Sequence, residues 1–174
     1  NRANPLLNTR WMGSAAVIRF AVVAAAIRVL LSEQNFGANG LLSVVGMGAD
    51  QLVGLYGVIT LASVAGLALS LATLNPKDLI LPVIISCGVI AVAAFMDADA
   101  SNLTRPAQLY VTQAMIAFAA IYFMGPTMLG GILHALARGP SHIVSFSAVF
   151  GISQQLGGIG GAALLGSFQI IRER

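Results

Sequence analysis

Long apolar runs separated by short polar connections dominate the pattern along the chain. Four stretches carry no Asp, Glu, Lys or Arg: residues 51–76, 79–96, 106–137 and 139–171. A helix needs roughly 20 mostly apolar residues to cross the hydrocarbon core of a bilayer, because each residue rises about 1.5 Å through a thickness of about 30 Å. The four stretches therefore predict four membrane-spanning helices.

A fifth stretch, residues 14–33, is apolar except for Arg19 and Arg28 and is counted as a further span. The predicted spans are then about 14–33, 51–74, 78–96, 107–136 and 142–171. Only helices and closed barrels satisfy the backbone in lipid, and these runs lack the alternation of barrel strands. The pattern predicts an all-α, polytopic transmembrane helix bundle, with Trp11 as an aromatic anchor at the membrane interface.

Composition supports this assignment and narrows the function classes. The chain is 57% hydrophobic and 9% charged, whereas soluble domains are about 25% charged. With so few charges, the net charge of +3 indicates no nucleic-acid partner. The chain has no metal-ligand spacing, no phosphate loop and no nucleophile beside a base. We therefore expect no metal, no cofactor and no enzymatic activity.

The charges of the connections predict an orientation. If the odd-numbered spans run outward, the first residues and the connections place four basic residues inside and one outside, which agrees with the positive-inside rule, while the terminal Arg172 and Arg174 fall outside and count against it. The inner set is Arg2, Arg10, Lys77 and Arg138, and the outer set is Glu33, Asp50, Asp97, Asp99 and Arg105. None of the spans holds a carboxylate at its centre, so a proton relay of the Asp or Glu type is expected elsewhere.

The last span, which contains SFSAVFGISQQLGGIGGAALLGSF at residues 145–168, has two unlike faces. At 100° per residue, one face is small and polar, and it is expected to face the bundle interior. It holds Ser147, Gly151, Gln154, Gly158 and Gly161, while Val149, Ile152, Leu156, Ile159 and Ala163 form the opposite face, expected toward lipid. Gly157 and Gly161 also form a small-xxx-small pair of the kind that packs helices closely.

Two interpretations stay open for each polar feature of the spans. Gln154, Gln155 and Gln113 either form hydrogen bonds between helices or line a transport path. The glycines of the last span serve close packing or act as a hinge. Arg28 and Arg19 either snorkel toward the interfaces or form an ion pair, or they bind substrate.

The fourth span is long and contains a proline next to a glycine. Pro126 lacks a backbone donor, and Gly125 relaxes the neighbouring backbone, so a bend is expected near residues 121–126. Broken helices of this kind occur beside transporter substrate sites. A passive packing kink is the alternative.

Three segments resemble a known family. NPLLNTRW, GPTMLGG and the 145–168 stretch are similar to the C-terminal half of major facilitator superfamily drug:proton antiporters of the fourteen-helix, multidrug-efflux type. The pattern of Gln154 to Gly158 followed by Ala162 to Gly166 carries most of this resemblance. GPTMLGG departs from the antiporter motif by one residue, and LNPKDL lacks the Gly-Asp-Arg character of the family's cytoplasmic loop.

The resemblance implies part of a proton-coupled exporter of amphipathic or aromatic compounds in the cell inner (plasma) membrane, working by alternating access. Residues 1–174 would form a partial C-terminal transmembrane domain of the major facilitator fold, without the N-terminal half and its coupling carboxylates. The implied partners are the lipid bilayer, the missing half, a small-molecule substrate and protons. The alternative function is a non-transporting membrane scaffold or assembly subunit.

Overall fold

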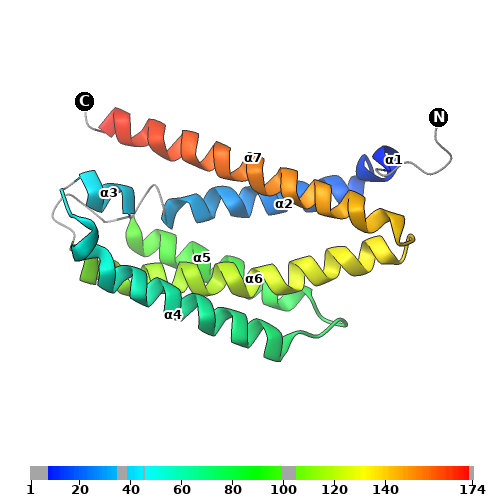
Figure 1. Ribbon diagram of the computed structural model, residues 1–174, viewed down its shortest axis with the longest axis horizontal. Helices are drawn as coiled ribbons and strands as arrows, with labels where there is room; N and C mark the ends of the chain where they lie inside the picture. Colours follow the sequence, from blue (N-terminus) through cyan, green and yellow to red (C-terminus); the bar gives the residue numbers. More distant parts are fainter. Residues whose placement is uncertain (1–7, 35–38, 45, 99–104, 173–174) are drawn as a thin grey trace.

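The computed structural model describes residues 8–34, 39–44, 46–98 and 105–172. Five long helices run side by side along one axis (Figure 1), and each is long and apolar enough to cross a membrane. The prediction of an all-α polytopic bundle is confirmed. The elements are α1 (Thr9–Met12), α2 (Ala15–Ser32), α3 (Asn39–Val44), α4 (Ala49–Thr73), α5 (Ile80–Asp97), the 3-10 helix η2 (Pro106–Leu109), α6 (Tyr110–Leu136) and α7 (Ser141–Arg172).

Local chemistry explains where these helices begin and end. In the α4–α5 connection the side chain of Asn75 accepts a hydrogen bond from the backbone N–H of Lys77 at 3.0 Å. The side chain of Asp78 accepts one from the N–H of Leu81 at 3.3 Å, which satisfies a free donor of the first turn of α5. Gly139, with φ of +120°, makes the tight turn between α6 and α7. The polar connections found in the sequence therefore form the helix ends.

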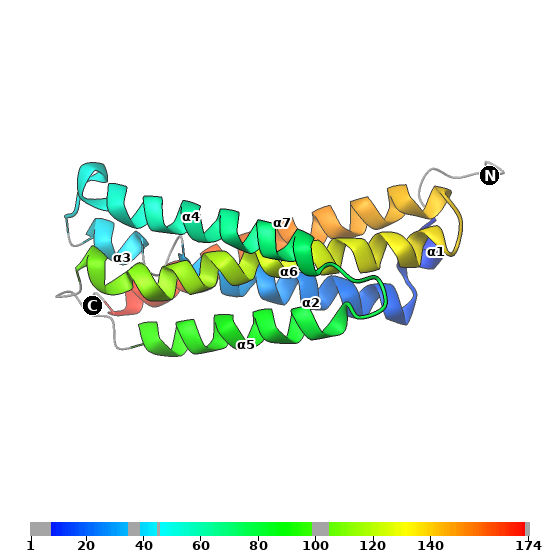
Figure 2. The same cartoon turned by 90° about the horizontal axis from the view of Figure 1, so that it is seen from below.

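The long helices form two groups. α2 packs along α7, while α4 and α5 both pack against α6, and α6 meets α7 over a shorter stretch. Figures 1 and 2 show the α2/α7 pair lying beside the group of α4, α5 and α6. We call the end of the bundle that holds α1 and the α6–α7 turn the α1 end, and the opposite end the α3 end.

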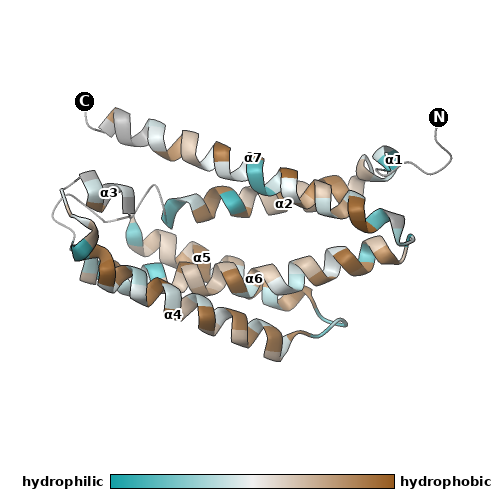
Figure 3. Ribbon diagram, viewed as in Figure 1, coloured by the Kyte–Doolittle hydropathy of each residue, from teal (hydrophilic) through white to brown (hydrophobic). Residues whose placement is uncertain are grey.

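Large apolar side chains cover the outside of the bundle. Leu61 on α4 and Ile80 on α5 are each 73% exposed, and Phe95 on α5 is 82% exposed. Figure 3 shows hydrophobic residues along the length of the long helices, with hydrophilic segments at helix ends and also within α2 and α7. A soluble monomer rarely exposes apolar patches of this extent, so this surface is suited to contact lipid.

Close backbone approach at glycines explains how each group packs. In the α2/α7 pair, a Cβ on Gly157 would overlap the carbonyl oxygen of Ala25, and one on Gly161 would lie 3.0 Å from that of Val29. In the other group, a Cβ on Gly66 of α4 would lie 2.5 Å from the carbonyl oxygen of Phe118. Small residues let helix backbones come together where lipid supplies no hydrophobic driving force. The Gly157 and Gly161 pair thus lies in the α2–α7 contact.

An apolar cluster joins the two groups at the α1 end. We call it the apolar joint, and its buried members are Trp11, Val17, Ala135, Phe146 and Val149. The rings of Phe20 and Phe146 lie 5.4 Å apart between centroids, and a Cβ on Gly131 of α6 would overlap the Phe146 ring. Trp11, predicted as an interfacial anchor, is 6% exposed, and its ring packs 5.3 Å from that of His142.

Candidate functional site

A polar cluster joins the two groups at the α3 end. We call it the polar joint, and it consists of Glu33, Gln34, Asp97 and Gln113. The amide nitrogen of Gln113 donates to a carboxylate oxygen of Asp97 at 2.8 Å and to one of Glu33 at 3.4 Å. The side chain of Gln34 donates to the backbone carbonyl of Gln113 at 3.2 Å. Residues from the ends of α2 and α5 therefore meet on the first turn of α6.

The amide of Gln113 is the centre of this joint. Its side chain is completely buried, and its carbonyl oxygen has no hydrogen-bond partner. The reverse amide orientation would set that oxygen against two carboxylates, which repel it, so the N–H groups face Asp97 and Glu33. A buried acceptor without a donor costs about 1–3 kcal/mol. The joint thus retains an unused acceptor beside two acidic side chains.

The sequence singled out Gln113 but placed its partners in the outer loops. Glu33 and Asp97 each fall at the end of an apolar run, and the orientation analysis put both on the same side of the membrane. Gln113 follows soon after the next run begins on that side. The sequence therefore placed all three residues near the same face of the membrane, and this was the signal that could have grouped them. It could not show that the three helices approach one another there.

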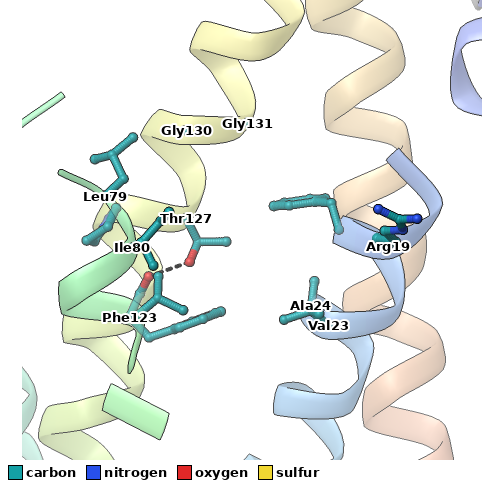
Figure 4. Close-up of a pocket in the computed structure, with 12 residues that line it drawn as sticks. Arg19, Val23, Ala24, Leu79, Ile80, Phe123, Thr127, Gly130 and Gly131 are labelled. Carbon is teal, nitrogen blue, oxygen red and sulfur yellow. Dashed lines mark hydrogen bonds between the residues drawn. The ribbon is translucent and has the colours of Figure 1, made fainter. Parts of the chain in front are cut away.

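An apolar cavity of about 340 Å³ lies between the two helix groups. Figure 4 shows Leu79, Ile80 and Phe123 on one wall and Val23 and Ala24 on the facing wall. The volume is within the range of sites for small organic ligands. Neither the pattern nor the composition of the chain indicated it, because its walls come from α2, α5 and α6.

Few polar groups line this cavity. Arg19 of α2 is the charged residue of its lining. The hydroxyl of Thr127 already donates to the carbonyl of Phe123 at 2.8 Å, so it is engaged within α6. The arrangement suits an aromatic or aliphatic compound, with Arg19 available for a polar or anionic substituent. Arg19, predicted to snorkel, to form an ion pair or to bind substrate, lies at the cavity.

A second cavity of about 180 Å³ adjoins the first toward the α1 end. The two cavities share Phe20, Gly130 and Gly131, and the second reaches Trp11 and His134. Together they extend along the α2–α6 boundary and reach the apolar joint. The indole N–H of Trp11 is buried without a partner.

Arg28 lies across the glycine pair of α7. A Cβ on Gly157 would meet the Cβ of Arg28 at 2.7 Å, and a Cβ on Gly158 would lie 3.7 Å from its Nε atom. Gly157 is thus needed for backbone approach, and Gly158 borders the guanidinium. The half-buried Arg28 side chain therefore runs over α7, between the α2–α7 contact and the polar face of α7.

The packed face of α7 differs from the predicted one. Val149, assigned to the lipid face, is buried, while Ser147 and Gly151, assigned to the interior, are exposed. The residues that pack on α2 and the apolar joint follow a stripe of four-residue spacing: Val149, Ser153, Gly157 and Gly161. This stripe lies between the two predicted faces, because close approach to α2 depends on small size more than on polarity.

The remaining predicted site residues lie outside the cavity. Gln154 is half-buried and Gln155 is exposed, and neither hydrogen-bonds to a described residue. A Cβ on Gly151 would meet nothing within 4 Å. Ile152, Leu156 and Ile159 are exposed, as expected for a lipid face. The polar side of α7 is therefore uncovered in the described part of the chain.

Gly125 and Pro126 lie inside α6, which continues as one helix from Tyr110 to Leu136. Pro126 is buried and lines the 340 Å³ cavity, and it cannot donate to the carbonyl of Tyr122. A Cβ on Gly125 would overlap the hydroxyl of Ser70 on α4. The pair thus combines close α4–α6 packing with an interruption of the α6 hydrogen-bond ladder beside the cavity.

Comparisons with family models, with curated proteins and with solved structures found no match to this chain. The resemblance to the major facilitator superfamily therefore stays a prediction. The structure supports a multi-pass membrane protein with five candidate spans.

Proposed function

We propose that this chain is part of a secondary transporter that exports amphipathic or aromatic compounds across the cell inner membrane by alternating access, driven by protons. The observation that carries the proposal is the apolar cavity between the two helix groups (Figure 4). A compound bound there would contact α2 on one side and α5 and α6 on the other. Movement of one group against the other would then change the access of that compound to each side of the membrane.

The contacts between the groups favour such a movement. The groups are internally well packed, and between them lie the apolar joint at one end, the polar joint at the other and the cavities between. Pro126 weakens the α6 ladder at the cavity wall. Two internally packed units with few shared contacts form an arrangement that suits hinge or rocking motions.

A cavity-filling substitution tests this function. Val23 lines the cavity and is 49% exposed, whereas its neighbour Val22 is 62% exposed and does not line it. Val23→Trp should fill the cavity and lower the efflux rate of an aromatic dye about tenfold, and Val22→Trp should leave it within about twofold. The measurement is dye efflux from energised cells expressing the full protein at matched levels, with an anionic and a cationic dye of similar size.

Equal efflux by the two variants would contradict the proposal. The role of Arg19 is tested in the same assay, because Arg19→Gln should reduce efflux of the anionic dye more than that of the cationic dye. A larger loss of efflux for the cationic dye than for the anionic dye would contradict a role of Arg19 in substrate binding.

A scaffold function is the second candidate, favoured by the uncovered polar side of α7. A partner helix seated there would contact Ser147 and Gly151, both of which are exposed. Gly151→Leu should then abolish co-purification of that partner while Val23→Trp preserves it. Efflux that is lost in Val23→Trp and retained in Gly151→Leu would favour the transporter.

A further inference from the structure

Aromatic rings line both cavities between the helix groups. Phe20 and Phe123 line the larger cavity, and Phe20, Phe146 and Trp11 line the smaller one. Phe123 and Phe146 are each 3% exposed, so they belong to the inner part of the lining. Aromatic rings pack on other aromatic rings in offset-stacked or edge-to-face arrangements. The adjoining cavities are therefore suited to the aromatic body of one ligand that extends through both.

A charged group of such a ligand finds little support inside the larger cavity. Besides Arg19, the polar residue of its lining is Thr127, whose hydroxyl already donates to the carbonyl of Phe123 at 2.8 Å. That hydroxyl has no second hydrogen to offer to an anion. Because burial of a charge without a partner is costly, the charged group of a bound ligand must lie at the mouth of this cavity.

Arg19 lies at that mouth. It lines the larger cavity and its side chain is exposed, and Figure 4 shows it on the α2 wall with Val23 and Ala24. It is four residues after Ala15, so it lies about 6 Å along the axis from the first residue of α2. Among the described residues, none forms a hydrogen bond or an ion pair with Arg19. A charge in a membrane-spanning segment is stabilised by pairing, so this guanidinium is available to the anionic group of a ligand.

The sign of the ligand charge follows from the two linings. No Asp or Glu is among the described residues that line either cavity, and Arg19 is the charged residue of the larger one. A cationic ligand would meet the charge of Arg19 with no carboxylate to offset it, whereas a carboxylate or sulfonate can accept two N–H bonds from one guanidinium. We propose that the two cavities form one binding site for aromatic anions, in which the ring system lies between the helix groups and the anionic group pairs with Arg19.

This assignment narrows the exported compound from amphipathic or aromatic molecules in general to aromatic carboxylates and sulfonates. It rests on the proposed function in naming what is exported, whereas binding can be measured without transport. The faces of aromatic rings also attract cations, which works against the expected preference. A guanidinium carries a full charge and a ring carries only a quadrupole, so pairing with Arg19 should decide which ligands bind.

Trp11 provides a readout of binding. It is the one tryptophan of this chain and it lines the smaller cavity. Anilinonaphthalene sulfonate, an aromatic anion, absorbs the light that tryptophan emits. Its binding to the purified full protein in phosphatidylcholine nanodiscs should therefore give saturable energy transfer, and Trp11→Phe should remove that transfer. Three competitors with the same ring system and different charges then measure the preference: naphthalenesulfonate, naphthylmethanol and naphthylmethylammonium.

In the wild type, naphthalenesulfonate should displace the probe at about tenfold lower concentration than naphthylmethylammonium, with the neutral alcohol between them. Arg19→Gln should weaken binding of the sulfonate about tenfold and leave that of the alcohol within about twofold. Arg19→Lys keeps the charge and should keep the preference for the anion. Arg28→Gln is the matched control, because Arg28 is on the same helix but lies against Gly157 and Gly158 of α7. It should keep the wild-type order of the three competitors.

The proposal is overturned if the ammonium competes as well as the sulfonate in the wild type, a result that needs no variant to fold. It is also overturned if the energy transfer does not saturate, as for a probe dissolved only in lipid, or if Arg19→Gln and Arg28→Gln weaken binding equally.

These binding measurements do not depend on dye transport. A preference for the anion together with equal efflux by Val23→Trp and Val22→Trp would uphold the binding site and reject the transport proposal. Efflux that is lost in Val23→Trp, with no preference for the anion, would uphold transport and reject the aromatic-anion site.

Discussion

The two joints between the helix groups hold the same pair of units together by different chemistry. At the α1 end, the apolar joint brings aromatic rings of α1, α2 and α7 against α6, with Phe146 over Gly131. At the α3 end, the polar joint uses hydrogen bonds from Gln113 to two carboxylates and one from Gln34. The apolar joint depends on how well its side chains fit together, and the polar joint depends on charge and hydrogen bonds.

This difference determines what each joint responds to. Packing of apolar rings depends on shape, and it fails when the shapes no longer fit. A buried polar network is strong when fully satisfied and weak when a donor or acceptor is left over. The polar joint has such a leftover acceptor on Gln113. It is therefore the end of the bundle where a small chemical change can alter how the groups meet.

The largest expected effect is on the apolar joint. A Cβ on Gly131 would overlap the Phe146 ring, which is only 3% exposed. Gly131→Leu should lower the free energy of unfolding by about 2 kcal/mol through overpacking. Thermal unfolding in detergent measures this. Gly88→Leu on α5, where a Cβ would meet nothing within 4 Å, is the matched control.

A smaller effect is expected at the polar joint. Gln113→Leu removes the N–H donors of Asp97 and Glu33, which should cost about 1–2 kcal/mol of unfolding free energy. Gln155→Leu, at an exposed glutamine of the same kind, should change stability by less than about 0.5 kcal/mol. A loss in Gln113→Leu no larger than that in Gln155→Leu would contradict the contribution of the Gln113 amide to the polar joint.

The fold was predictable from the sequence because its determinants are local. Charge-free runs of sufficient length define spans, and the predicted bounds lie within a few residues of α2, α4, α5, α6 and α7. The role of Gly157 and Gly161 was also indicated by their spacing. What the pattern could not give is which helix lies beside which, because an apolar surface suits lipid and a neighbouring helix equally well.

The same limit explains the errors on α7. Polarity alone turned Ser147 and Gly151 inward, whereas the contact with α2 buries Val149 and Ser153. In lipid, a helix face packs on a neighbouring helix when its side chains are small enough for the two backbones to approach. Polar side chains add little to this packing unless they find a hydrogen-bond partner. The cavity and the polar joint were missed for a related reason. Each is built from three helices, and no one segment carries its signature.

The smallest expected effect concerns the buried indole of the apolar joint. The Trp11 N–H is unpartnered, so Trp11→Phe removes a donor whose burial costs about 1–3 kcal/mol. It also removes part of a ring that packs 5.3 Å from that of His142, and lost packing of this kind costs a similar amount. The two changes oppose each other, and the free energy of unfolding should stay within about 0.5 kcal/mol of the wild type. Trp11→Leu, which loses the aromatic contact as well, should be clearly less stable.

A loss above about 2 kcal/mol in Trp11→Phe would mean that the N–H donates to a group in the adjoining 180 Å³ cavity, and the α1 end would then hold a polar contact of its own.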